Sequence, residues 1–445
     1  MNTKLIAVIA VVIVVAAAVG SVVYITGDDE DQGVRNYNGR LMVFGNANND
    51  DYIDEEDVKV LESIVNDGAE WDKVNNPYAD ATHDGKIDQS DIDWVKRMIN
   101  REPMDIWYEN AANDDCCISY PIGNIVVIGS DSMRAMQILG LKDKVVGRNG
   151  SSNPDLYLDP TLNATIFKNA VQVSPSTSKI DIGLLTNLMD TTPVDVIVTG
   201  KTTLSTVEPQ VNKLGVDIVH MAFNDDQVGV NSFITMGYLA NNEETAVMVA
   251  KFFDDLLSDI EGKLASIPEV DRVSAISMGG GGALYCNDLE TGYGSWILKA
   301  GAVSPVTRAM LDGENSKTVV KGDTWHLSSA YDTEYVVYSQ GFSYAYDGEY
   351  FADNYWNSYI ERFSWDRMTP SNYPESVVLI NWNLYQPLGV AYLCGVFYSD
   401  VFGEDYGDRV HQEFIDLFYS DLSSADYKAS EHCFCVTYDD VKAYL

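Results

Sequence analysis

The sequence predicts an α/β protein in which one long helix joins two lobes of alternating strands and helices, preceded by a small all-α module. Three observations lead to this fold class. Apolar residues recur at helical spacing from Asn241 to Ile267. Strand-helix-strand patterns flank this segment, opening with NIVVIG at 124–129 and with VSAISMG at 273–279. Two similar acidic segments lie nearer the N-terminus, each running into a helical pattern.

Composition limits the class of protein and its partners. The chain has 445 residues, of which 46% are hydrophobic, so it is long enough to bury large cores in two or three domains. Its formal charge of −38 excludes nucleic acid as a partner, because binding to phosphates requires clustered Lys and Arg. Cations and basic protein surfaces are the expected partners. The six cysteines show no CxxC spacing, which argues against a zinc or thioredoxin-like site.

The N-terminus predicts a membrane anchor. Leu5 to Ile25 is an uninterrupted apolar run, long enough to cross a bilayer. Lys4 before the run and acidic residues after it predict that the N-terminus lies inside and the bulk of the chain lies outside the cell. We therefore expect an anchor at 1–27 and an acidic linker at 28–38. Cleavage near Ala16 to Ala18, as in a signal peptide, is the alternative.

The two acidic segments predict calcium loops. Each spans twelve residues, with oxygen-bearing side chains at nearly all of positions 1, 3, 5, 9 and 12 and an isoleucine at position 8. Calcium takes six or more oxygen ligands, and position 7 contributes its backbone carbonyl. Two acidic turns that only cap helices are the alternative. The predicted ligands are Asn46, Asn48, Asp50, Tyr52, Asp54 and Asp57 in loop one, and Asp80, Thr82, Asp84, Lys86, Asp88 and Asp91 in loop two.

The region 39–103, which carries these loops, resembles a type I dockerin, whose loops end in Asp as Asp57 and Asp91 do here. The resemblance implies two calcium sites and a cohesin domain as a possible partner. Loop one departs from the pattern with Asn46 at position 1, so we expect loop two to bind calcium more tightly. A calcium-stiffened spacer is the alternative role. Dockerins contact cohesins through loop positions 10 and 11, here Glu55, Glu56, Gln89 and Ser90.

The region 104–445 resembles the class III periplasmic binding proteins, with strands such as VDVIVTG and VDIVHMAF before the long helix. The resemblance implies two Rossmann-like lobes at about 122–240 and 268–445, joined by the helix at 241–267. Asn241 and Glu244 form a capping-box pattern at the start of that helix. Members of this family are the substrate-binding partners of ABC importers. An ABC permease and an iron-siderophore, haem or cobalamin-type ligand, meaning a metal chelate or a corrinoid, are the implied partners.

The predicted ligand site lies where strands end, because ligands of open α/β sheets bind beyond the carboxyl ends of the strands. The basic candidates would pair an anionic ligand and the aromatic ones would stack on a planar ligand. Ordinary surface charge and ordinary packing are the alternatives. The candidates are Ser130, Asp131, Arg148, Lys201 and Thr202 in the first lobe, and Gly280, Tyr285, Trp325, His326 and Trp382 in the second.

Catalytic signatures are missing from the sequence. It contains no GxSxG or HExxH pattern and its five histidines form no cluster, so we expect no enzyme. Two rival functions remain: a cell-surface assembly protein that docks to cohesins and recognises glycans or other ligands, and an enzyme built on paired α/β lobes.

Two patterns bear on export. Asn149 and Asn163 begin N-glycosylation sequons. Export also permits disulfides, and we hypothesise that one joins the pair Cys116 and Cys117 to the pair Cys433 and Cys435.

Overall fold

The computed structural model describes residues 40–150, 167, 169–174, 179–200, 204, 206–225, 229–279, 285–287, 292–305, 317–318, 333–357, 375–419, 422 and 427–445. The chain divides into two compact units, Met1–Glu102 and Pro103–Leu445. The predicted anchor and linker lie outside the described residues. Within the described residues, no helix combines the length and hydropathy that a membrane span requires.

The described part of the first unit, from residue 40 on, contains two helices, each starting inside one of the acidic loops. Helix α1 is Glu55–Asp67 and helix α2 is Gln89–Ile99, and the two contact each other. Asp54 and Asp88 cap them, and each takes part in a reciprocal capping box with the Asp three residues later. Each helix buries one stripe of side chains, which forms the core of the unit: Val58 and Leu61 from α1, and Ile92, Val95 and Met98 from α2.

The first lobe of the second unit is a parallel sheet with a hairpin before it. The hairpin pairs β1 (Met104–Glu109) with β2 (Asp115–Tyr120) and was not predicted. The sheet has the order β5-β4-β3-β6-β7, as expected for a doubly wound lobe. Its strands are β3 (Ile125–Val127), β4 (Val145–Asn149), β5 (Val171–Ser174), β6 (Val196–Thr199) and β7 (Asp217–His220); its helices are α3 (Ser130–Ile138), α5 (Ile182–Met189), α6 (Glu208–Asn212) and α7 (Gly229–Leu239).

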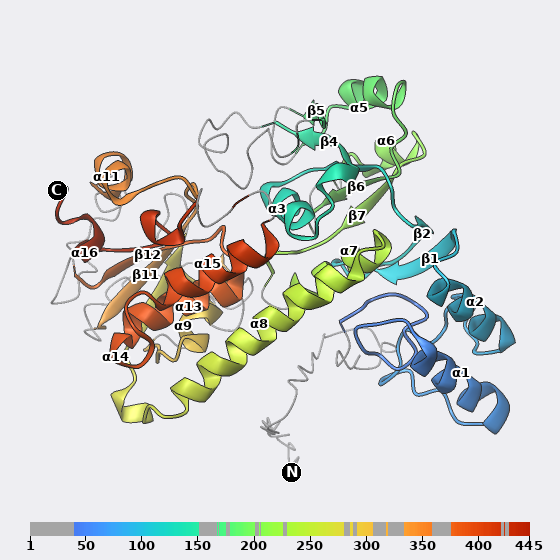
Figure 1. Cartoon of the computed structure of the whole chain (residues 1–445), viewed down its shortest axis with the longest axis horizontal. Helices are drawn as coiled ribbons and strands as arrows, with labels where there is room; N and C mark the ends of the chain where they lie inside the picture. Colours follow the sequence, from blue (N-terminus) through green and yellow to red (C-terminus); the bar gives the residue numbers. More distant parts are fainter. Residues whose placement is uncertain are drawn as a thin grey trace, which may run out of the picture. The chain divides into compact units, whose positions relative to one another are not determined.

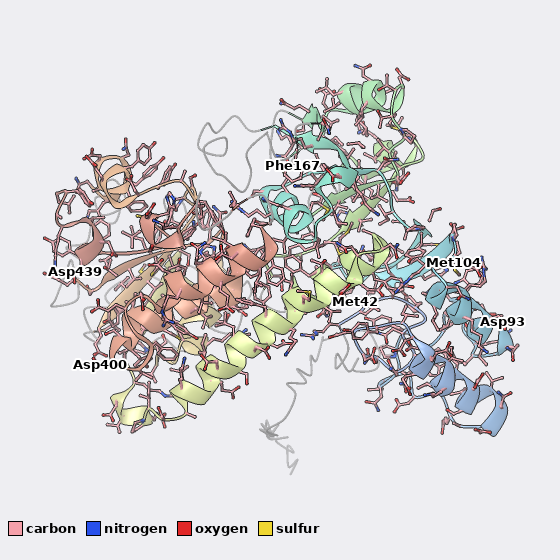
Figure 2. All side chains as sticks on the ribbon, in the orientation of Figure 1. Met42, Asp93, Met104, Phe167, Asp400 and Asp439 are labelled. Atoms are coloured by element: carbon pink, nitrogen blue, oxygen red, sulfur yellow. The ribbon has the colours of Figure 1, made fainter. Side chains whose placement is uncertain are left out.

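The second lobe has a mixed sheet of the order β10-β9-β8-β11-β12-β13, whose three central strands are parallel. Helices α13 and α15 are drawn over this sheet in Figures 1 and 2, and α13 packs against β11, where the Tyr335 ring lies 5.1 Å from the Phe397 ring. The strands are β8 (Ala275–Gly279), β9 (Tyr285–Asn287), β10 (Lys317–Thr318), β11 (Tyr335–Gln340), β12 (Val377–Asn381) and β13 (Cys435–Thr437). The helices are α9 (Gly292–Lys299), α11 (Gly348–Phe351) with a π-turn at Ala352–Trp356, α13 (Gln386–Phe397), α14 (Ser399–Phe402), α15 (Tyr406–Phe418) and α16 (Tyr438–Val441).

The long predicted helix is α8, Glu243–Leu264 (Figure 1). Its apolar stripe is buried as expected, and Phe253 contacts rings from both lobes: Phe233 on α7 at 6.3 Å, and Phe414 on α15 at 5.2 Å between centroids. The predicted capping box is wrong. Asn242 is the N-cap and makes no side-chain capping bond: its Nδ2 donates to the Leu139 carbonyl, and its Oδ1 accepts from the Thr245 hydroxyl at 3.4 Å. The residue before it, Asn241, adopts a left-handed φ of 55°.

Two export-related expectations fail in the structure. Cys116 and Cys117 lie on β2 of the hairpin, whereas Cys433 and Cys435 lie at β13 in the other lobe, and all four are free thiols. The hypothesised disulfide is therefore wrong. The Asn149 side chain is buried and accepts a hydrogen bond from the Gly129 N–H at 2.9 Å, so it is not available for glycosylation. Asn163 lies outside the described residues.

Candidate ligand-binding cleft and calcium loops

A cavity of about 420 Å3 lies at the carboxyl ends of three strands of the first lobe. The chain leaves β3 at Ile128, β6 at Gly200 and β7 at Met221, and all three segments line the cavity. This is the place where an open α/β sheet binds ligands. Its described lining consists of Ile128, Gly129, Ser130, Asp131, Ser132, Gly200, Met221, Ala222, Phe223, Asn224, Asp225 and Tyr293.

The N-terminus of α3 forms one wall of the cavity. Gly129 is its N-cap with φ 108°, and no side chain caps the helix. The backbone N–H groups of a first helical turn have no partner within the helix, and the helix dipole gives them a partial positive charge. Ser130 lies in this turn, as predicted for the site. The wall therefore offers hydrogen-bond donors to oxygen atoms of a ligand.

Asp131 adds a carboxylate to the same wall, and the positively charged Arg134 side chain lies beside it. The side chain of Asp131 is 43% exposed, and its Oδ1 lies 3.4 Å from Nη1 of Arg134, whose own side chain is buried. Desolvation in the cleft raises the pKa of Asp131, while the Arg134 charge lowers it. The guanidinium of Arg134 also lies over the ring of Tyr344 in the second lobe, 4.9 Å from its centroid.

The second lobe contributes Tyr293 to the lining of the cavity, and Trp382 connects this lobe to the first lobe. The Trp382 carbonyl accepts hydrogen bonds from Asn224 Nδ2 at 2.9 Å and from the Tyr293 hydroxyl at 3.3 Å. The rings of Tyr293 and Trp382 stack 6.3 Å apart. Gly341 is required here, since a Cβ at this position would come within 2.2 Å of Trp382 Nε1. Trp382 therefore lies where the two lobes meet, beside the cavity.

Among the other predicted residues that the structure describes, Arg148 does not join this group. Arg148 ends β4, and its Nη1 donates to the Asn149 carbonyl at 3.1 Å, but it does not line the cavity as described. Tyr285 lies in β9, and its side chain is outside the described residues. Lys201, Thr202, Gly280, Trp325 and His326 also lie outside them.

Several lining residues were not predicted, among them Asn224, Asp225 and Tyr293. Asn224 and Asp225 follow the strand VDIVHMAF, so the rule on carboxyl ends already pointed to them. Tyr293 begins a helix after a glycine-rich stretch, and no sequence signal marks it.

A larger cavity, of about 680 Å3, lies elsewhere in the second lobe. Its lining includes Tyr335, which begins β11, and Glu375, which precedes β12, so it borders the amino ends of these strands. Ligands of this fold bind at the opposite ends. The smaller cavity is therefore the candidate ligand site.

The two calcium loops share one backbone frame. Position 4 is left-handed in both, with φ 58° at Asn49 and at His83. The last residues, Asp57 and Asp91, are fully buried. Each accepts a 2.8 Å bond at Oδ2 from the position 9 N–H and a 3.0 Å bond at Oδ1 from the position 3 N–H. The predicted ligands therefore surround a buried carboxylate in each loop.

Burial disfavours the charged form of both carboxylates. Desolvation raises the pKa of Asp57 to about 7 and also raises the pKa of Asp91. Among the described residues, no three His, Cys, Asp or Glu side chains form a group that could hold a metal ion. A dockerin loop, however, also uses hydroxyl, amide and backbone oxygens. Loop two has four carboxylates and the Thr82 hydroxyl, so its donor set fits calcium.

These features together define a class: a two-lobed ligand-binding fold with one connecting helix, carrying an acidic two-loop helical module. Comparison with known proteins agrees. Residues 45–100 match the dockerin type I domain, which confirms the resemblance predicted for this region. Dockerin domains typically bind calcium. No curated protein matches the chain.

Solved structures with the same fold are periplasmic binding proteins. The TroA-like periplasmic binding protein FepB of Veillonella parvula is 13% identical, with 70% of this chain and 95% of that chain covered and a TM-score of 0.53. The molybdate periplasmic binding protein MolA of Haemophilus influenzae is 13% identical, with 70% and 97% covered and a TM-score of 0.50. The CeuE protein of Helicobacter pylori with Ni(II) bound is 13% identical, with 72% and 97% covered and a TM-score of 0.50. The predicted α/β fold is confirmed.

Proposed function

We propose that this chain is the substrate-binding component of an ABC importer and that it captures its ligand in the cavity between the lobes. The observation that carries the proposal is the cavity at the carboxyl ends of β3, β6 and β7, to which the second lobe adds Tyr293. The Trp382 carbonyl receives bonds from both Asn224 and Tyr293 beside it, so the ligand site and the lobe contact share residues.

The proposed ligand is a metal chelate, of the iron-siderophore, haem or corrinoid type. The described wall combines helix N–H donors at Ser130 with the carboxylates of Asp131 and Asp225. Donors and carboxylates side by side suit a ligand with both oxygen acceptors and hydroxyl or amine donors. Tyr293 lines the cavity and provides a ring for the planar part of such a ligand, and Trp382 stacks on that ring from beside the cavity.

Little lobe closure is expected when the ligand binds. Helix α8 crosses from one lobe to the other, and Phe253 packs on rings of both. A continuous helix resists bending more than flexible crossover strands do. We further propose that residues 1–27 anchor the protein in the cell membrane, with the remainder extracellular and facing the permease. Topology mapping with a protease added outside intact cells tests this placement.

Native mass spectrometry of the chain with ferric siderophores, haem and corrinoids tests the ligand class. We expect one ligand per chain, and at least tenfold weaker binding after Asn224→Ala, which removes a bond between the lobes. Asp254→Asn, on the exposed face of α8, is the matched control and leaves binding unchanged. If none of these siderophores, haem or corrinoids binds, the proposal that the ligand is a metal chelate is wrong.

A second candidate function rests on the dockerin match. In this alternative the module docks the chain to a cohesin-bearing partner, and the α/β unit recognises a glycan or another ligand. Surface plasmon resonance against a panel of immobilised cohesins distinguishes the two. Calcium-dependent cohesin binding favours assembly, whereas chelate binding alone favours import.

A further inference from the structure

The two calcium loops differ at position 1, although their backbone frames match. In loop two, Asp80 accepts the Asp84 N–H at Oδ1 (3.1 Å) and the Gly85 N–H at Oδ2 (2.7 Å). In loop one, the fully buried Asn46 accepts the Asp50 N–H at Oδ1 (3.1 Å). Its Nδ2 donates to the carbonyls of Leu41 (2.8 Å) and Asp50 (2.7 Å). The Asn46 side-chain amide therefore donates two hydrogen bonds to backbone carbonyls, at the position where Asp80 of loop two has a second carboxylate oxygen.

Position 3 repeats this difference. In loop one, Asn48 Nδ2 donates to Asp50 Oδ2 at 2.7 Å, so an amide occupies one carboxylate oxygen of a predicted calcium ligand. In loop two, the Thr82 hydroxyl donates instead to Asp91 Oδ1 at 3.1 Å. A hydroxyl can rotate and offer its oxygen to a cation, whereas the Asn48 amide already uses its own oxygen to accept the Asp50 N–H at 3.1 Å.

At position 6, loop one has a carboxylate that pairs with a positively charged side chain of the same chain. Loop two has Gly85 there, with φ 87°. Loop one has Asp51, and Arg40 binds it with two bonds, Nε to Oδ1 at 3.1 Å and Nη2 to Oδ2 at 2.5 Å. Both side chains are largely buried, with 24% and 18% exposed. A two-bond guanidinium-carboxylate pair of this kind is strong and fixes the geometry of both groups.

We infer that loop one is closed by its own amides and by Arg40 without a calcium ion, so that the module holds one calcium, in loop two. The donor set of loop one does not fit the ion, because it has three carboxylates against four in loop two, and because calcium would have to displace the Asn48 amide from Oδ2 of Asp50. The inference concerns only the module and is independent of the ligand proposed for the cleft.

Calcium stoichiometry of the full chain, measured by isothermal titration calorimetry, tests the inference. We expect one calcium per chain. Asp80→Asn should weaken this binding at least tenfold, whereas Asp50→Asn, which keeps an oxygen acceptor, should leave it unchanged. Two ions of similar affinity in the wild-type chain, or loss of the tight site in Asp50→Asn, would overturn the inference.

Terbium luminescence gives a readout specific to loop one. Tyr52 lies at position 7 of loop one, where its ring would sensitise a bound Tb3+, whereas loop two has Lys86 at that position. With one equivalent of Tb3+, Tyr52→Leu should leave the sensitised emission unchanged. A clear fall in emission would mean that loop one is occupied and would contradict the inference. Emission that depends on Asp80 but not on Tyr52 supports it.

Discussion

Removal of the Phe253 ring tests whether α8 holds the two lobes together. Phe253 is 2% exposed, and its ring lies 5.2 Å from Phe414, 6.1 Å from Tyr385 and 6.3 Å from Phe233. A buried Phe→Ala change costs about 3–5 kcal/mol in transfer and cavity terms. Since the ring has partners on both sides, we expect Phe253→Ala to lower the free energy of unfolding by that amount.

Urea unfolding combined with peptide-resolved hydrogen exchange measures this loss. Protection should fall in both α7 and α15, because each contributes a ring to the cluster around Phe253. Met248→Ala is the matched control on the same helix, since Met248 is 50% exposed, and should change stability by less than about 0.5 kcal/mol. A loss below about 1 kcal/mol in Phe253→Ala, or a loss of protection in only one lobe, would refute the role assigned to α8.

Three further predictions follow from other contacts. Gly389→Ala on α13 should lower the free energy of unfolding by about 1–3 kcal/mol, because the added Cβ would come within 2.1 Å of Trp296. Gly262→Ala on α8 meets no atom within 4 Å and should stabilise the helix by about 0.5–1 kcal/mol. Thermal melts in which Gly389→Ala is the more stable variant would contradict this packing. Burial lowers the pKa of His411 to about 3, so between pH 6.5 and 3 the unfolded chain binds more protons at this residue and stability falls as pH falls, by up to about 1.4 kcal/mol per pH unit. The pH profile of unfolding for His411→Gln should lack that part of the slope, and an unchanged profile would mean that His411 is not buried neutral. Calcium removal with EDTA should lower hydrogen-exchange protection in α2 but not in α3. If free calcium was 100 times its dissociation constant, the free energy of unfolding of the module falls by about 2.7 kcal/mol. Equal protection of α2 with and without EDTA would contradict a calcium site in loop two.

Local patterns predict those parts of the fold that burial alone determines. The apolar stripe of α8 has a helical period, and the strands at 196–199 and 377–381 are short continuous runs that are buried at every residue. The repeat of oxygen-bearing residues similarly identified both loops, because each ligand position is fixed by its place in the chain.

Prediction failed where distant residues decide the local conformation. Asn242 donates to the carbonyl of Leu139, the residue that follows α3, and its Oδ1 accepts from the Thr245 hydroxyl, so the predicted capping box does not form. Cysteine spacing carries no information on which sheet each thiol joins, so a bond between the pair Cys116 and Cys117 and the pair Cys433 and Cys435 could not be judged from it. Tyr293 enters the cleft only because the second lobe folds against the first, which no local signal reports.

Arg134 links the ligand cleft to the contact between the lobes. Its guanidinium lies over Tyr344 in the second lobe and also reaches Asp131, which lines the cavity. The carboxylate and the ring both stabilise this positive charge, because the Arg134 side chain is only 1% exposed to water. Separating the lobes would remove the Tyr344 ring from the guanidinium, so the contact between the lobes helps to hold Arg134 beside Asp131. A ligand that pairs with Asp131 competes with Arg134 for the same carboxylate, while the packing of α8 on both lobes keeps the change in lobe position small.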